Sequence, residues 1–122
     1  NLVHYNWHWF WHWGTVEALN NGTHELDVMR WGLGVDYPTK VSSTGGRFHF
    51  EDDWETPDTQ VINFEFPGRV MMTWEGRSCN NHPIEGSGRG VTFYGTNGTM
   101  VIPGGADYKV FDLQNKLVKE VK

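Results

Sequence analysis

Hydrophobic positions recur with a helical period between Gly14 and Gly34 and with a strand period in most of the chain beyond. One predicted helical face is apolar and is expected to dock on a core; its members are Leu19, Gly22, Leu26, Met29 and Leu33. An adjoining stripe gathers an amide, an imidazole, a carboxylate and an indole, at Asn20, His24, Asp27 and Trp31. Because a solvated helix more often carries Lys and Glu there, this second stripe is typical of a pocket wall.

The ends of this predicted helix are better defined than its middle. Thr15 is a candidate N-cap, and Gly34 is a typical stop signal. The run Asn20, Asn21, Gly22 weakens the middle, because each of these residues is a poorer helix former than alanine. We therefore expect either one continuous helix held by tertiary packing, or a helix that begins later, near Asn20 or Asn21.

From residue 40 onward the period changes to two, which predicts strands. Lys40–Phe50 is predicted to be one strand with a bend at its double glycine. Residues 59–66 and 70–75 alternate around Pro67 and Gly68 and predict a hairpin. Its apolar positions share one face: Ile62, Phe64, Phe66, Val70, Met72 and Trp74. Two further hairpins are predicted around turns at residues 95–98 and 113–116.

These elements predict an α+β fold in which residues 1–122 form a single domain, since 122 residues is the length of one domain. One principal helix is expected to pack on a mainly antiparallel, largely open β-sheet of about five or six strands. A single helix cannot cover such a sheet on both faces. The remaining face is therefore expected to meet solvent, another subunit or a further domain.

The segment before the helix, HYNWHWFWHW from His4 to Trp13, is rich in large aromatic side chains. Its composition and the following glycine favour an extended or irregular conformation. Three interpretations remain open: aromatics that cover a sheet end or a domain interface, a metal site, and a sugar site. In the last, Trp11 and Trp13 stack on pyranose faces while His12 bonds hydroxyl groups. A metal site needs a fourth ligand and an oriented outer shell, and we assign no metal ligand.

Composition excludes several classes of function. The net charge is -5 and basic residues are scattered, which argues against binding to nucleic acid or to an acidic membrane surface. The longest apolar runs are too short for a transmembrane helix, and no secretory signal is visible, so a cytoplasmic and an exported location both stay open. The only cysteine is Cys79, which excludes an internal disulfide. The aromatic beginning leads us to expect further sequence upstream.

The stretch GTVEALNNGTHELDVMRW resembles the signature segment of the Gfo/Idh/MocA oxidoreductases. That family has a glycine-led helix bearing an acidic residue and then the Gly, His, Asp and Trp that match Gly22, His24, Asp27 and Trp31 in order and spacing. The later strands, with WEGRSC and the closing hairpins, also resemble that family's C-terminal domain. The likeness therefore covers nearly the whole chain.

The resemblance implies a division of labour with an N-terminal Rossmann domain, which this chain lacks and which would bind NAD or NADP. His24 would then act as the general acid/base together with a lysine of that domain. Asp27 would orient His24 or hold a substrate hydroxyl, and Arg77 is assigned to substrate binding. Asn20 stands where the family usually has an acidic residue, so it would hydrogen-bond the substrate without taking a proton.

The resemblance thus implies the substrate-binding and oligomerisation domain of an NAD(P)-dependent oxidoreductase that acts on a sugar, a sugar derivative or a cyclitol hydroxyl. We expect the isolated chain to be inactive, and a homo-oligomer to form through the open sheet face. Redox-assisted glycoside hydrolysis stays open as well. Two other classes compete: a stand-alone carbohydrate-binding module, and a structural dimerisation domain whose interface is the face of Ile62 and Met72.

Overall fold

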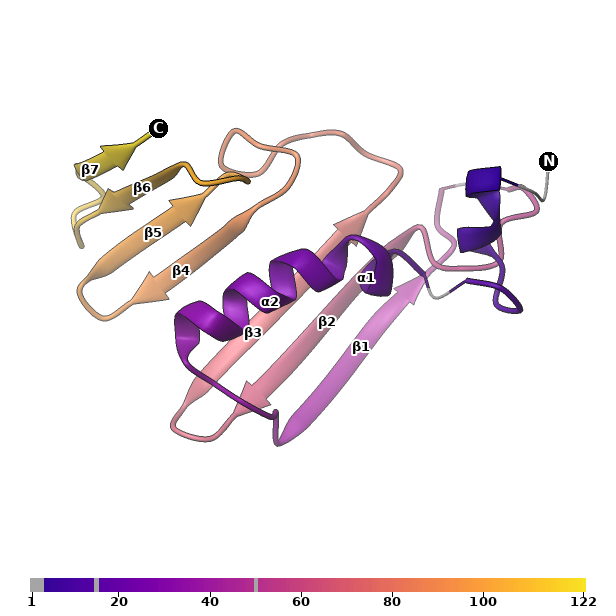
Figure 1. The fold of residues 1–122 in the computed structure, drawn as a ribbon, viewed down its shortest axis with the longest axis horizontal. Helices are drawn as coiled ribbons and strands as arrows, with labels where there is room; N and C mark the ends of the chain where they lie inside the picture. Colours follow the sequence, from indigo (N-terminus) through magenta and orange to yellow (C-terminus); the bar gives the residue numbers. More distant parts are fainter. Residues whose placement is uncertain (1–3, 15, 50) are drawn as a thin grey trace. The chain divides into compact units, whose positions relative to one another are not determined.

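A computed structural model describes residues 4–14, 16–49 and 51–122 (Figure 1). The chain divides into two compact units, Asn1–Asn80 and Asn81–Lys122. The first contains η1 (His4–Trp9), α1 (Val16–Asn20), α2 (Gly22–Leu33), β1 (Lys40–Gly46), β2 (Thr59–Phe66) and β3 (Val70–Arg77). The second contains β4 (Val91–Gly95), β5 (Gly98–Ile102), β6 (Tyr108–Phe111) and β7 (Leu117–Val121). Within the described ranges, no helix has the length and apolar character needed to cross a membrane.

The helical stretch is neither continuous nor late to begin: α1 is already helical from Val16, and after a break at Asn21 the longer helix α2 begins at Gly22, close to the later of the two expected starts. At the break, the side-chain amide of Asn21 donates to the carboxylate of Glu17, and Thr23 Oγ1 donates to the carbonyl of Asn20 at 3.0 Å. These local bonds compete with a continuous helical ladder, as expected of Asn and Thr. Leu19 is 58% exposed and does not join the docking face, because it belongs to the separate helix α1.

The end of α2 follows the predicted stop signal. Gly34 adopts a left-handed conformation with φ of 65°, and the N–H of Val35 donates to the carbonyl of Arg30 at 3.3 Å. This arrangement satisfies carbonyl groups that the helix end leaves without partners. The predicted N-cap, Thr15, lies outside the described residues.

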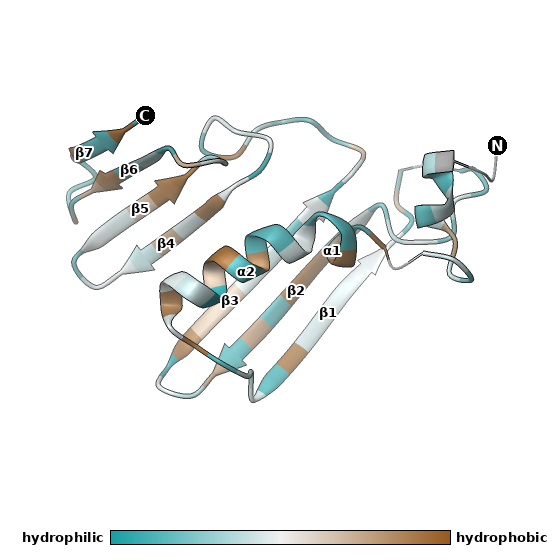
Figure 2. Ribbon diagram, viewed as in Figure 1, coloured by the Kyte–Doolittle hydropathy of each residue, from teal (hydrophilic) through white to brown (hydrophobic). Residues whose placement is uncertain are grey.

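The first unit is built on an antiparallel sheet in the order β1-β2-β3. Its register pairs Ile62 with Trp74 and Phe64 with Met72, which confirms the predicted common face. Helix α2 lies on this face, where Met72 and Trp74 are buried at 4% and 7% exposure (Figure 1). Alternating hydrophobic and hydrophilic residues along α2 and β2 are visible in Figure 2. A dimer interface through Ile62 and Met72 is therefore wrong, because that face is the core under α2.

The opposite face of this sheet is largely polar. Lys40 Nζ lies 3.5 Å from a carboxylate oxygen of Glu65, and Thr73 Oγ1 donates to Asn63 Oδ1 at 2.8 Å. Met71 is the main apolar exception, with 66% of its surface exposed. The face thus carries paired polar groups beside one exposed methionine side chain.

The prediction of a single sheet of about five or six strands is wrong. The described strands form two antiparallel sheets, one of three strands and one of four. The division falls in residues 78–90, where Gly, Pro and Asn favour turns over pairing. A principal helix packed on a sheet therefore describes only the first unit.

Strand β1 is shorter than predicted. It ends at Gly46 instead of continuing to Phe50, which itself lies outside the described residues. After β1, the chain enters a loop because the side chain of Asp58 accepts the backbone N–H groups of Phe48 and His49 at 3.2 and 3.1 Å. Because these N–H groups donate to a carboxylate, they are not available to extend the pairing of β1 with β2.

The second unit is a four-stranded meander in the order β4-β5-β6-β7, and both predicted hairpins are confirmed. Val91 and Val101 are its buried apolar side chains. At the first turn, Gly98 has φ of 156° and its α-carbon lies against the carbonyl of Phe111, where a side chain would collide. In the last turn, Asp112 Oδ1 accepts the backbone N–H groups of Gln114 and Lys116, both at 2.9 Å.

Candidate functional site

Helix α2 presents a polar and aromatic surface that we call the outer stripe: His24, Asp27 and Trp31. All three are exposed, and Trp31 exposes 83% of its surface. Their spacing of three and four residues places them on one side of α2. Asn20 is half-buried and belongs to α1, so the break at Asn21 separates it from the helix that bears His24. The outer stripe therefore faces solvent, and neither α1 nor α2 supplies residues opposite it.

The first part of the aromatic segment is helical and not extended or irregular as predicted, whereas residues 10–14 are irregular as predicted. His4–Trp9 forms the 3-10 helix η1. The His8 ring stacks on Trp7 with centroids 3.7 Å apart, and its Nδ1 donates to the carbonyl of Tyr5 at 2.6 Å. These contacts join residues one and three positions apart, which a helical turn permits and an extended strand does not.

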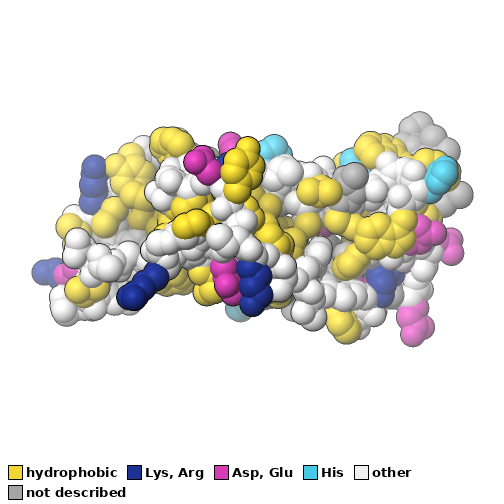
Figure 3. Space-filling view, turned by 90° about the horizontal axis from the view of Figure 1, so that it is seen from below, with side chains coloured by type: hydrophobic (Ala, Val, Ile, Leu, Met, Phe, Trp, Pro, Cys, Tyr) yellow, Lys and Arg dark blue, Asp and Glu magenta, His cyan; other side chains and the backbone are white. Residues whose placement is uncertain are grey.

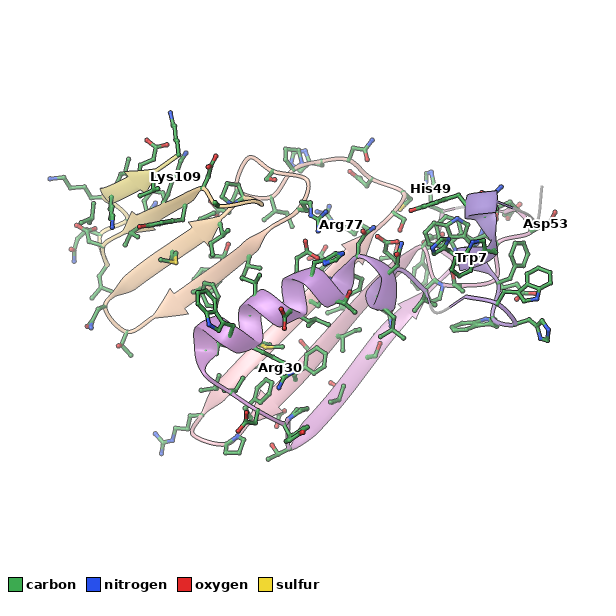
Figure 4. All side chains as sticks on the ribbon, viewed as in Figure 1. Trp7, Arg30, His49, Asp53, Arg77 and Lys109 are labelled. Carbon is green, nitrogen blue, oxygen red and sulfur yellow. The ribbon has the colours of Figure 1, made fainter. Side chains whose placement is uncertain are left out.

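A polar and aromatic tether fixes η1 to the loop 47–58. The carbonyl of Trp9 accepts the N–H of Glu55 at 2.9 Å, and the rings of Trp9 and Trp54 stack with centroids 4.3 Å apart. The backbone N–H of Trp11 donates to Glu55 Oε2 at 2.9 Å. Figure 4 shows Trp7, His49 and Asp53 gathered where η1 meets this loop. The loop therefore anchors η1, whereas the acidic sequence Glu51 to Asp58 alone is typical of a solvated connection or of the rim of a site.

Beyond this anchor, the three predicted sugar-binding residues Trp11, His12 and Trp13 are all exposed. Trp11 exposes 61% and Trp13 53% of its surface, and His12 meets Trp13 edge to face with centroids 5.7 Å apart. Figure 3 shows hydrophobic side chains at the surface beside histidine and acidic groups in the region of η1 and its loop. Flat rings next to hydrogen-bonding groups suit a polyhydroxylated ligand.

The loop under the tether is held by charge. Asp58 is buried at 1% exposure, also accepts the hydroxyl of Thr59 at 2.9 Å, and lies 3.9 Å from Arg47 Nε. Arg47 reaches outward as well, donating to Asp52 Oδ1 at 2.6 Å and lying 5.4 Å above the Trp54 ring. The hydrogen bond from Arg47 lowers the pKa of Asp52. Sequence reasoning missed this anchoring role, because an acidic loop alone does not reveal which carboxylate is buried.

Arg77, predicted to bind substrate, ends β3. Its Nε lies 2.8 Å from Glu75 Oε1. Because alternate residues of a strand point to opposite faces, Arg77 and Glu75 share the face that α2 does not cover, while Trp74 faces the helix. The alternation along β3 thus separates Arg77 from the face on which α2 and His24 lie.

Within the described ranges, no three side chains among His, Cys, Asp and Glu are grouped so as to hold a metal ion. Two side-chain surfaces of the first unit carry groups suited to chemistry: the outer stripe, with an imidazole and a carboxylate, and the tethered aromatic segment. The first suits proton transfer, and the second suits stacking on a sugar.

In the first unit, helix α2 covers an antiparallel sheet, buries Gly22 and exposes His24 and Asp27. This Gly-x-His-x-x-Asp spacing on a covering helix points to an oxidoreductase domain. The sequence model described as the GFO/IDH/MocA C-terminal domain matches residues 1–101, and the chain belongs to this family. The resemblance expected from Gly22, His24, Asp27 and Trp31 is confirmed. No curated protein and no solved structure matches the chain.

Proposed function

We propose that the chain is the substrate half of an NAD(P)-dependent oxidoreductase that acts on a hydroxyl group of a sugar, a sugar derivative or a cyclitol. The observation that carries the proposal is the outer stripe: an exposed imidazole and carboxylate on one side of α2, in a domain of an oxidoreductase family. A substrate held against this stripe would meet His24 directly.

We assign NAD or NADP to a Rossmann domain upstream. Dinucleotide sites of that type hold the pyrophosphate on a glycine-rich turn between a strand and a helix N-terminus. Helix α2 follows helix α1 and not a strand, so the start of α2 is not built in that way. When bound, the cofactor supplies or accepts the hydride.

The part of this chain in the reaction is proton transfer and orientation. In the oxidative direction, a ring nitrogen of His24 accepts the proton of the substrate hydroxyl as hydride leaves the carbon that bears this hydroxyl. In the reductive direction, His24 returns the proton to the oxygen. Asp27 lies one turn further along α2 and is assigned to hold a neighbouring hydroxyl. Asn20, at the end of α1, is assigned to donate or accept a hydrogen bond only.

The test uses the full-length gene product, with D-glucose, D-galactose and myo-inositol as probes and NAD+ or NADP+ as acceptor. His24→Ala should lower turnover by roughly a hundredfold or more while NAD(P) affinity changes little. The matched control is His82→Ala, an exposed histidine outside α2, which should keep wild-type turnover. Unaltered turnover in His24→Ala removes His24 from the mechanism. Asn20→Asp should change the pH profile of turnover if that position touches the reacting hydroxyl.

A second candidate is a carbohydrate-binding module without catalysis, which the exposed indoles of Trp11 and Trp13 favour. Such a module should change its tryptophan fluorescence when the same sugars are added to the chain alone, and Trp11→Ala with Trp13→Ala should abolish the change. A half-enzyme should respond weakly until the upstream domain is present. The homo-oligomer stays a prediction, and the sheet face opposite α2 is its proposed site.

A further inference from the structure

Helix α2 meets β3 at the buried indole of Trp74, which lies against one glycine of the helix and one glycine of the strand. A β-carbon added at Gly22, the first residue of α2, would lie only 2.9 Å from Trp74 Cε2 and 3.0 Å from Nε1. A β-carbon added at Gly76 would collide with Cη2 of the same ring. The indole of Trp74 is therefore bounded by glycine both at the helix start and on its own strand.

This arrangement leaves the start of α2 little freedom relative to β3. Real β-carbons essentially never approach a heavy atom within 3.0 Å, so any larger residue at position 22 must displace the helix or the ring. The Trp74 ring has little room to move away from the helix, because it is buried at 7% exposure and already lies against Gly76 of its own strand. His24 is only two residues beyond Gly22, in the first turn, and moves with it.

We propose that Trp74 is a positioning residue: its indole, held between Gly22 and Gly76, fixes the place of His24 on the sheet. The inference rests on the proposed function of His24 as acid/base. It assigns Gly22 of the family signature a packing role and explains why β3 carries glycine two residues after its tryptophan. Position matters for such a group, since a misplacement of about 1 Å can lower turnover about a hundredfold.

The test is a double-variant cycle on the chain, read by NMR of the His24 ring and by amide exchange in the first turn of α2. Gly22→Ala should shift the His24 ring resonances and speed exchange there. Trp74→Phe replaces the indole with a smaller ring and removes Nε1 and Cζ2, two of the three atoms nearest to the new methyl group. Gly22→Ala combined with Trp74→Phe should therefore return the resonances toward those of Trp74→Phe alone, a non-additive result expected for groups in contact.

Two controls separate positioning from general stability. Met72→Ala empties the same core face on the same strand, and it should lower the unfolding midpoint while leaving the His24 ring resonances in place. Gly88→Ala has open space around its new methyl group and should change nothing. Equal shifts from Met72→Ala, or additive shifts in the cycle, overturn the positioning role.

Turnover of the full-length variants completes the test with the same three probes. If His24 is the acid/base, turnover should fall about ten- to a hundredfold in Gly22→Ala, recover in part in the double variant, and leave KM much less changed. If the effects of Gly22→Ala and Trp74→Phe are non-additive but His24→Ala leaves turnover unchanged, the proposed function is overturned while the packing contact stands. The two failures are thus distinguishable.

Discussion

Replacing Asp58 with asparagine is the sharpest test of how the aromatic segment is anchored. The buried carboxylate accepts two backbone N–H groups, from Phe48 and His49, and the hydroxyl of Thr59. Asparagine keeps one acceptor oxygen and places an NH2 group where the other oxygen was. One N–H of the loop then faces a donor, and Arg47 loses its buried counter-charge.

The cost follows from these contacts. A hydrogen bond to a charged group contributes about 1.5–3 kcal/mol, and a buried donor without an acceptor costs about 1–3 kcal/mol. These two effects overlap, so we expect Asp58→Asn to lower the free energy of unfolding by about 2–4 kcal/mol. With a urea slope of about 1.5 kcal/mol/M, the midpoint should fall by about 1–3 M.

Tryptophan fluorescence is a suitable assay, because all seven tryptophans lie in the first unit and report its unfolding. The matched control is Asp53→Asn, an exposed carboxylate of the same loop, which should change the free energy of unfolding by less than about 0.5 kcal/mol. A midpoint for Asp58→Asn as close to wild type as that of Asp53→Asn would refute the anchoring role.

Two further predictions concern the same anchor. The pKa of Asp52 is held below its ordinary value of 3.8, so the stability that its carboxylate contributes is present above about pH 4 and is lost as the pH falls through the lower folded value. The urea midpoints of wild type and Asp52→Asn should therefore differ at pH 7 and converge at strongly acid pH. A difference that stays constant with pH would contradict this prediction. Trp9→Leu removes the stacked pair with Trp54 and should lower the free energy of unfolding by at least about 0.5–1.5 kcal/mol in the same assay, whereas an unchanged midpoint would show that the stack contributes nothing.

The parts of the fold that were predicted depend on residues close together in the sequence. The hairpin around Pro67 and Gly68, the two later hairpins and the stop at Gly34 are each specified by turn chemistry next to alternating or helical positions. The weakness of the helix near Asn21 was predicted for the same reason, although the resulting break between two helices was not. Local signals of this kind do not need the rest of the chain.

The parts that were missed depend on contacts between distant residues. The bond between Trp11 and Glu55 joins residues 44 positions apart, and it holds a segment whose composition indicated only an extended or irregular chain. The division into two sheets also has no local signature, because alternation gives the faces of a strand and not its partner. For Trp74, a signal was present: Gly76 lies on the same face two residues on, which is where an indole can lie flat across its own strand.

The two candidate surfaces are held in place by different interactions, the outer stripe by apolar packing and the aromatic segment by polar contacts. His24 is placed by apolar packing of α2 on Trp74, which salt hardly changes. The aromatic segment depends on polar contacts, including an exposed ion pair between Arg47 and Asp52, and exposed ion pairs are weakened by salt. Salt and acid should therefore loosen the surface of Trp11 before they move His24. If the two surfaces serve one reaction, substrate affinity should weaken under these conditions before the maximal turnover rate falls.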